Sequence, residues 1–230
     1  IFTESQLKQI FTLANKGEQE IKMGKNNKVE LLGEISSEFR YYFKSNEQTF
    51  YRSTIKVERN SGNFVEIPFV VSGRITEEEC SIGQSVKIKG EYRSRFKNGH
   101  VLLYVLAEEF EPVSDIGYEN KIFLDGYICK NPIYRKTPLG KEITDIILAV
   151  NRDDGKSDYI PCIAWHRNAR IMENLPVGAH IKIDGRVQSR QYVKKLSEEY
   201  AETRTAYEVS IWRLGVLSGE ECKDQVSDAE

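Results

Sequence analysis

The sequence has few of the features that mark a metal protein or a membrane protein. Its 230 residues include only four cysteines and three histidines, scattered with no Cys-x-x-Cys pair. A zinc site needs clustered Cys and His ligands at a recognisable spacing, so we expect no metal. No apolar run approaches the roughly 20 residues that span a bilayer, and no signal peptide opens the chain. Scattered cysteines in apolar strands suit reduced thiols, so we expect a cytoplasmic protein without membrane contact.

The chain also lacks the residue sets of catalysis. No Ser/His/Asp or Cys/His set recurs at plausible positions, and no phosphate-binding loop of the GxxxxGK[ST] type is present. Asp153, Asp154 and Asp158 are close in sequence, but acidic residues beside Gly155 are typical of a turn. The sequence therefore predicts no enzymatic activity, no catalytic residue and no cofactor.

An internal repeat organises what is present. The segment NKVELLGEI at 27–35 resembles NKIFLDGYI at 120–128, at an offset of 93 residues. The same offset relates 55–74 to 148–167, and after a change of two residues the repeat continues from 82–95 to 177–190. A chance repeat would not keep its register across several loops, so the chain contains two copies of one fold.

Each copy consists mostly of short predicted strands. Gly33 and Gly126 lie at equivalent places in the first strand, where a bend or bulge is expected. A helical or coiled link follows the third strand, RITEEEC at 74–80 in one copy and NARIMENL at 168–175 in the other. Five strands with a helix between the third and fourth is the order of an OB-fold barrel. We therefore predict a mostly all-β chain of two tandem five-stranded OB-fold barrels.

The predicted domains are an N-terminal helical segment, two barrels and a short acidic tail, at 1–26, 27–113, 118–217 and 218–230. Thr3 can cap a helix over 3–17 whose apolar stripe would dock on a barrel or on a neighbouring subunit. Between strands four and five the first copy has the tight-turn pair Asn98-Gly99. The second copy has KKLSEEYAET at 194–203 instead, which we expect to project as a flexible charged finger.

Comparison of the two copies separates the core from the surface. On the third strand of the second copy, Tyr159 aligns with Glu66 and Trp165 aligns with Ser72. A position that holds Glu or Ser in one copy is a poor core position in the other, so both aromatic residues are expected on an accessible face. The positions between them are apolar in both copies and are predicted core: Ile160, Cys162 and Ala164.

The fourth strand alternates in the same way. Its predicted inward row in the second copy is Ile181, Ile183 and Val187, and its outward row is basic and reaches Tyr192. Residues 120–217 hold 16 Lys and Arg against 12 Asp and Glu, whereas residues 27–113 hold 12 against 13. The second copy is therefore the better candidate for binding a polyanion.

Exposed aromatic residues among cations suit a single strand of nucleic acid. Unpaired bases stack on aromatic rings with roughly 1–3 kcal/mol per base, and Arg and Lys pair with phosphates in a salt-dependent way. The pattern does not separate DNA from RNA. The alternative is a protein-interaction scaffold with weak nucleic-acid binding, because Trp and Tyr are also enriched at interfaces. For Phe123 and Tyr127 on the first strand, interface burial and ligand contact stay equally open.

The second copy resembles the bacterial single-stranded DNA-binding protein (SSB) family. The resemblance is carried by NKIFLDGYICKNPIYRKTPLGKEITDIILAVNR, SDYIPCIAWHRNARIMENLPVGAHIKIDGRVQSRQY and TAYEVSIWRL. The first copy resembles the family only through the register of the second, with EFRYYFKSNEQTF in place of the Pro-Gly loop. The resemblance implies that Tyr159, Trp165 and Tyr192 stack on bases, and it places Arg135 and Lys136 at the family's first-loop pair.

The resemblance further implies sequence-independent binding and protection of single-stranded DNA in replication, recombination or repair. Family members typically offer four barrels, so two barrels per chain imply a homodimer. The tail ends in Asp228-Ala229-Glu230 without an apolar tip, so recruitment of replication proteins through such a tip is not expected.

These arguments give two sets of predicted contacts to single-stranded DNA. The main set, in the second barrel, is Tyr159, Trp165, Tyr192, Arg135, Lys136, Arg152, Lys182, Arg186 and Arg190. A secondary set, in the first barrel, is Tyr41, Phe43, Arg93, Arg95 and Lys97.

Overall fold

The computed structural model describes residues 26–45, 47–58, 62–73, 80–97, 100–114, 117–195 and 201–217. Four predictions fall wholly or largely outside these ranges: the N-terminal helix, the link at 74–80, the Asn98-Gly99 turn and the acidic tail. Within these ranges, no helix is long and apolar enough to cross a membrane.

Strands make up most of both barrels. The first contains β1 (Asn27–Ile35), β2 (Arg40–Ser45), β3 (Gln48–Glu58), β4 (Phe64–Ser72), β5 (Ser85–Lys97) and β6 (His100–Pro112). The second contains β7 (Glu119–Ile128), β8 (Ile133–Lys136), β9 (Glu142–Asn151), β10 (Ser157–Trp165), β11 (His180–Lys195) and β12 (Ala201–Val216). Helix α2 (His166–Glu173) follows β10, which confirms the predicted link of the second copy.

Two segments predicted as loops form strands instead. β2 and β8 arise from the first loop of each barrel and pair with the strand that follows, so each barrel has one strand beyond the predicted five. The prediction of a charged finger over 194–203 is wrong at both of its ends, because β11 runs to Lys195 and β12 begins at Ala201. β-branched residues such as Val193, Thr203 and Thr205 favour a long hairpin there in spite of the charges.

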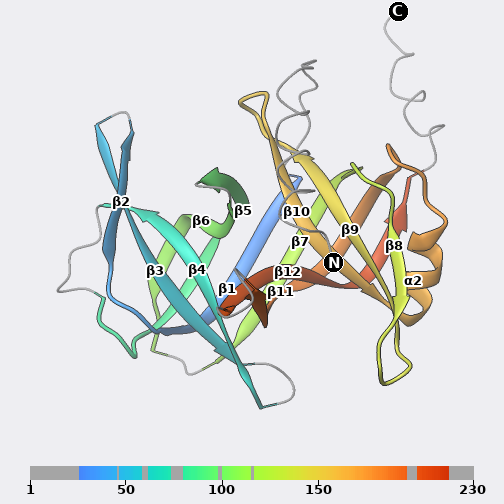
Figure 1. The fold of residues 1–230 in the computed structure, drawn as a ribbon. Coiled ribbons are helices and arrows are strands. Elements are labelled where there is room, and N and C mark those ends of the chain that lie inside the picture. The colour runs from blue at the N-terminus through green and yellow to red at the C-terminus, as the bar shows by residue number, and fades with distance from the viewer. Residues whose placement is uncertain are drawn as a thin grey trace, which may run out of the picture.

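The two barrels share one sheet. Asn27–Leu32 of β1 pair antiparallel with Glu119–Leu124 of β7, and the whole forms a 12-stranded sheet. Each first strand also pairs with two strands of its own barrel, β1 with β3 and β5, and β7 with β9 and β11. The barrels therefore lie side by side, joined through their first strands (Figure 1).

Glycine is required where each barrel closes. A Cβ on Gly33 would lie 2.3 Å from the carbonyl oxygen of Lys56, and a Cβ on Gly126 would lie 2.4 Å from that of Ala149. Both distances are too short for any side chain. Only glycine therefore allows β1 to pass this close to β3, and β7 to pass this close to β9. The bend expected at these two glycines is thus a point of close backbone approach.

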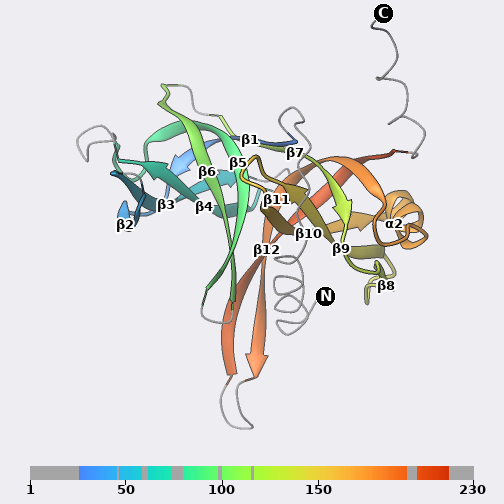
Figure 2. The same ribbon diagram turned by 90° about the horizontal axis from the view of Figure 1, so that it is seen from above.

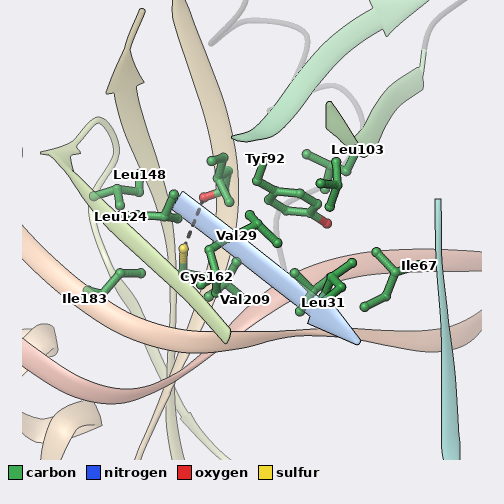
Figure 3. Packing of buried hydrophobic residues seen from close by; sticks show 14 of the residues in the cluster. Val29, Leu31, Ile67, Tyr92, Leu103, Leu124, Leu148, Cys162, Ile183 and Val209 are labelled. Atoms are coloured by element: carbon green, nitrogen blue, oxygen red, sulfur yellow. Dashed lines mark hydrogen bonds between the residues drawn. The ribbon is translucent and has the colours of Figure 1, made fainter. Parts of the chain in front are cut away.

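The core follows the alternation that the repeat predicts. The inward rows of β10 and β11, the predicted third and fourth strands of the second barrel, are buried. They include Ile160, Cys162, Ala164, Ile181, Ile183 and Val187. They belong to one cluster that continues into the first barrel (Figure 3). Tyr92 of β5 is fully buried in this cluster, and burial raises the pKa of its phenol well above the ordinary value. The two barrels are therefore held by a shared apolar core as well as by strand pairing.

Two asparagines make equivalent contacts in the two copies. The Nδ2 of Asn27 donates to the Tyr92 carbonyl and its Oδ1 accepts from the Tyr92 N–H, each at 2.9 Å. Asn120 makes the same pair with Val187, at 2.8 and 2.9 Å. The backbone of each asparagine pairs with the other barrel's first strand. The side-chain amide of each asparagine therefore continues the hydrogen-bond ladder within its own barrel, to β5 for Asn27 and to β11 for Asn120.

Replacing these asparagines should destabilise the fold unequally. Asn27→Ala leaves the buried Tyr92 N–H and carbonyl without their partner, and we expect a loss of about 1–3 kcal/mol in the free energy of unfolding. Asn120 is only partly buried, so water can replace its amide and the loss should be smaller. Urea denaturation of both variants measures the difference. Equal losses at the two positions would contradict this account.

Candidate nucleic-acid interface

A groove of about 860 Å³ lies between the two barrels. One wall is β6 of the hairpin β5–β6, and the other is the hairpin β11–β12, which extends in the same direction (Figure 2). Ile147 and Pro161 of the second barrel also line it. The hairpins contact each other where Nη1 of Arg204 lies 3.1 Å from Nδ1 of His100. The groove therefore exists only because both barrels contribute to it.

Two predicted contacts meet in this groove. Arg190 and Tyr192 both line it, and the guanidinium carbon of Arg190 lies 5.6 Å from the centroid of the Tyr192 ring. Tyr192 is 38% exposed, and the Nε of Arg190 lies 3.6 Å from the Glu208 carboxylate. A ring beside a cation offers a stacking surface for a base and a charge for its phosphate.

Trp165 lies on the same face of β10 as Pro161, because residues four apart in a strand point the same way. The indole is partly buried, and its Nε1 donates to Oγ of Ser210 at 3.1 Å. This hydrogen bond fixes the ring plane and leaves part of the ring accessible. Trp165 itself does not line the groove, and Ile163, which lies between it and Pro161 on this face, is buried.

The prediction that Tyr159 is accessible is wrong. Tyr159 is only 7% exposed, and burial raises the pKa of its phenol. β5 of the first barrel reaches this end of β10, where the Tyr159 N–H donates to Oγ of Ser94 at 2.8 Å. The equivalent Glu66 is exposed on β4. The comparison of copies failed here because equivalent positions of the repeat meet different neighbours.

Arg152 and Arg93 are engaged with a buried carboxylate rather than presented to a ligand. The Asp158 side chain is fully buried; Nε of Arg152 donates to its Oδ2 at 2.6 Å, and Nη1 of Arg93 does so at 3.2 Å. The Ser94 N–H donates to the other oxygen at 2.6 Å. A buried carboxylate is tolerated only when it is paired and hydrogen-bonded. These predicted phosphate contacts instead join the first barrel to the second.

The remaining predicted cations do not line the groove. Nε of Arg135 donates to Asp145 at 2.8 Å, and Lys136 is exposed at the end of β8. Nζ of Lys182 lies 3.6 Å from Asp125, and Arg186 is partly exposed further along β11. Of the main predicted set, and within the part of the chain that the structure describes, only Arg190 and Tyr192 line the groove.

Several groove residues were missed by the sequence analysis. His100 and Leu102 come from the first barrel, whereas Lys194, Arg204 and Tyr207 come from the hairpin of the second. The basic character of Lys194 and Arg204 was visible, but the segment around them had been assigned to a loop. No pattern within one copy could find His100, because the groove forms only between the copies.

In the secondary set, exposure varies. Tyr41 is 66% exposed, and Lys97 is also exposed at the end of β5. Phe43 is partly exposed and stacks on Phe50 with ring centroids 4.6 Å apart. The guanidinium carbon of Arg95 lies 5.9 Å from the centroid of Phe43. All of these residues except Arg93 thus remain available at the surface of the first barrel.

Removing the charge of Asp158 should weaken the joint between the barrels. Asp158→Asn leaves the partly buried guanidinium group of Arg152 without its carboxylate partner and leaves Arg93 paired with Glu91 alone, and we expect a loss of about 3–5 kcal/mol in the free energy of unfolding. Asp154→Asn is the matched control, since its carboxylate is half-exposed, 3.9 Å from Lys156 Nζ, and should contribute about 0–1 kcal/mol. Urea denaturation compares the two. Similar losses would show that Asp158 does not hold the barrels.

The arrangement defines a class, the tandem OB-fold proteins. The wild-type single-stranded DNA binding protein from Thermus aquaticus has a similar structure, with a TM-score of 0.63 at 22% sequence identity. The similarity covers 84% of this chain and 93% of that chain. The predicted pair of OB-fold barrels is therefore confirmed.

The second barrel is similar to proteins of a known family. Residues 119–217 match the model of the single-strand binding protein family. Single-stranded DNA-binding protein 1 of Staphylococcus aureus (strain COL) is 38% identical over 80 residues, 32% of this chain and 48% of that protein. Single-stranded DNA-binding protein A of Bacillus subtilis (strain 168) is 36% identical over 80 residues, 32% of this chain and 46% of that protein. The second barrel is thus similar to the single-strand binding protein family, and the chain spans about half the length of these curated relatives.

Proposed function

We propose that this protein binds single-stranded DNA without sequence preference and protects it during replication, recombination or repair. The observation that carries the proposal is the groove in which Tyr192 offers its ring beside Arg190, on a barrel that matches the single-strand binding family. Rings stack on any unpaired base, and a duplex hides its base faces. The groove would therefore select the state of the strand rather than its sequence.

The proposed role is non-catalytic and cytoplasmic. DNA binding is favoured over the alternative, a protein-interaction scaffold. A protein-interaction scaffold would use Trp165 and the neighbouring aromatic residues at an interface. The indole N–H of Trp165 is already bonded within its own barrel, to Ser210, and the family match points to DNA. The scaffold is therefore not favoured.

We also infer a homodimer that offers four barrels, because each chain supplies two. Light scattering on the full chain should give twice the mass of one chain, with and without a dT oligomer. A mass of one chain under both conditions would contradict the homodimer but leave DNA binding open.

Fluorescence tests the binding itself. Both tryptophans, Trp165 on β10 and Trp212 on β12, lie in the second barrel. Titration with poly-dT should quench their emission, and the affinity should fall as salt is raised because phosphate contacts release counterions. An unchanged emission, or an affinity that is indifferent to salt, would overturn the proposal.

A variant pair tests the groove. Tyr192→Ala removes one stacking ring and should weaken binding of a dT oligomer about 5- to 100-fold. Tyr127→Ala is the matched control, since Tyr127 is also 38% exposed but stacks on His180, which lies outside the groove. Fluorescence anisotropy gives the affinities, and light scattering shows whether either variant changes the oligomer. If both variants weaken binding equally, the groove is not the binding site.

A further inference from the structure

Four aromatic rings form a continuous row on the first barrel. Phe50 of β3 stacks on Phe43 of β2, with ring centroids 4.6 Å apart and 18° between the planes. Phe43 lies 5.2 Å from Tyr42, and Tyr42 lies 5.8 Å from Tyr104 of β6. All four side chains are partly exposed. We call Phe50, Phe43, Tyr42 and Tyr104 the aromatic row.

Cations accompany the row. The guanidinium carbon of Arg95 lies 5.9 Å from the ring centroids of both Tyr42 and Phe43. Residues 40–52, which supply three of the rings, hold three Arg and Lys and one Glu. The surface around the row thus combines ring faces with positive charge, which suits a ligand that has aromatic bases and anionic phosphates.

The shared fold does not require these rings. In the second barrel the repeat places Arg135 and Lys136 where the first has Tyr42 and Phe43. It places Ile143, which is buried, where the first has the partly exposed Phe50. An OB-fold barrel therefore forms without the row, and the row is a feature of the first barrel alone.

The row leads to the groove. Tyr104 and Leu102 alternate onto the same face of β6, since residues two apart in a strand point the same way. Leu102 lines the groove. The Tyr104 end of the row therefore adjoins the groove.

We propose that a single strand leaving the groove continues along the aromatic row, which stacks its bases while Arg95 pairs with a phosphate. The inference rests on the proposed function and extends it. The first barrel then supplies a second stacking surface of its own, and one chain contacts a longer strand than the second barrel can hold.

Oligomers of two lengths separate this proposal from the function on which it rests. One OB-fold covers roughly 4–16 nucleotides, so labelled dT oligomers of about 10 and about 35 nucleotides are used with the full chain. Tyr42→Leu keeps an apolar side chain but removes the ring face. It should bind the short oligomer like the wild type and the long one about 5- to 100-fold more weakly.

Two further variants guard against a trivial loss of structure. Phe64→Leu is the matched control: Phe64 is 44% exposed with Lys56 Nζ 4.0 Å from its ring centroid, but its ring neighbour is Tyr118, outside the row. It should change neither affinity. Arg95→Gln leaves every ring in place and should lower the salt dependence of binding for the long oligomer only.

The outcomes are distinct. If the wild type binds neither oligomer, the proposed function itself fails. If it binds both and Tyr42→Leu weakens neither, the row lies off the path of the strand and this inference is overturned while the function stands. If light scattering shows that Tyr42→Leu dissociates the oligomer, and both lengths bind equally weakly, the row is a subunit contact and the inference is also overturned.

Discussion

The antiparallel pairing of β1 with β7 sets the positions of everything else in the molecule. The two first strands run antiparallel, and the long hairpins of the two barrels extend side by side in the same direction (Figure 2). The asparagines at 27 and 120 keep each barrel's own ladder intact at this junction. The groove is a consequence of the pairing, since neither hairpin alone encloses it.

The two copies share a fold but differ in the side chains at the junction between the barrels and at the proposed DNA-binding surfaces. Asp158 joins the barrels through Arg152 and Arg93, but the equivalent residue of the first copy is the buried Val65. The ion-pair network is therefore formed on one side only. In the same way the aromatic row exists only on the first barrel, whereas the exposed Tyr192 belongs to the second. The two copies of one fold therefore carry different side chains at the surfaces that we propose to contact DNA.

The sequence was sufficient for the pair of barrels and for most of the core. Alternation is a local property, so the inward placement of Ile160 and Ile183 followed directly from the strands that contain them. It was not sufficient for Tyr159, whose N–H donates to Ser94 of the first barrel, 65 positions away. Nor was it sufficient for Arg152, which bonds the nearby Asp158 and also the Ser94 carbonyl, 58 positions away. The groove itself could not be predicted for the same reason. Contacts between the copies depend on how the barrels pair, and no repeat pattern contains that information.

Photo-crosslinking tests the central claim, that a single strand lies in a groove built by both barrels. A dT oligomer carrying a photoreactive base is bound to the full chain and irradiated, and the attached peptides are identified by mass spectrometry. We predict cross-links to the hairpin β11–β12, at Tyr192 or Tyr207, together with cross-links to β6 of the first barrel. Cross-links confined to β7, around Phe123 and Tyr127, would contradict the account.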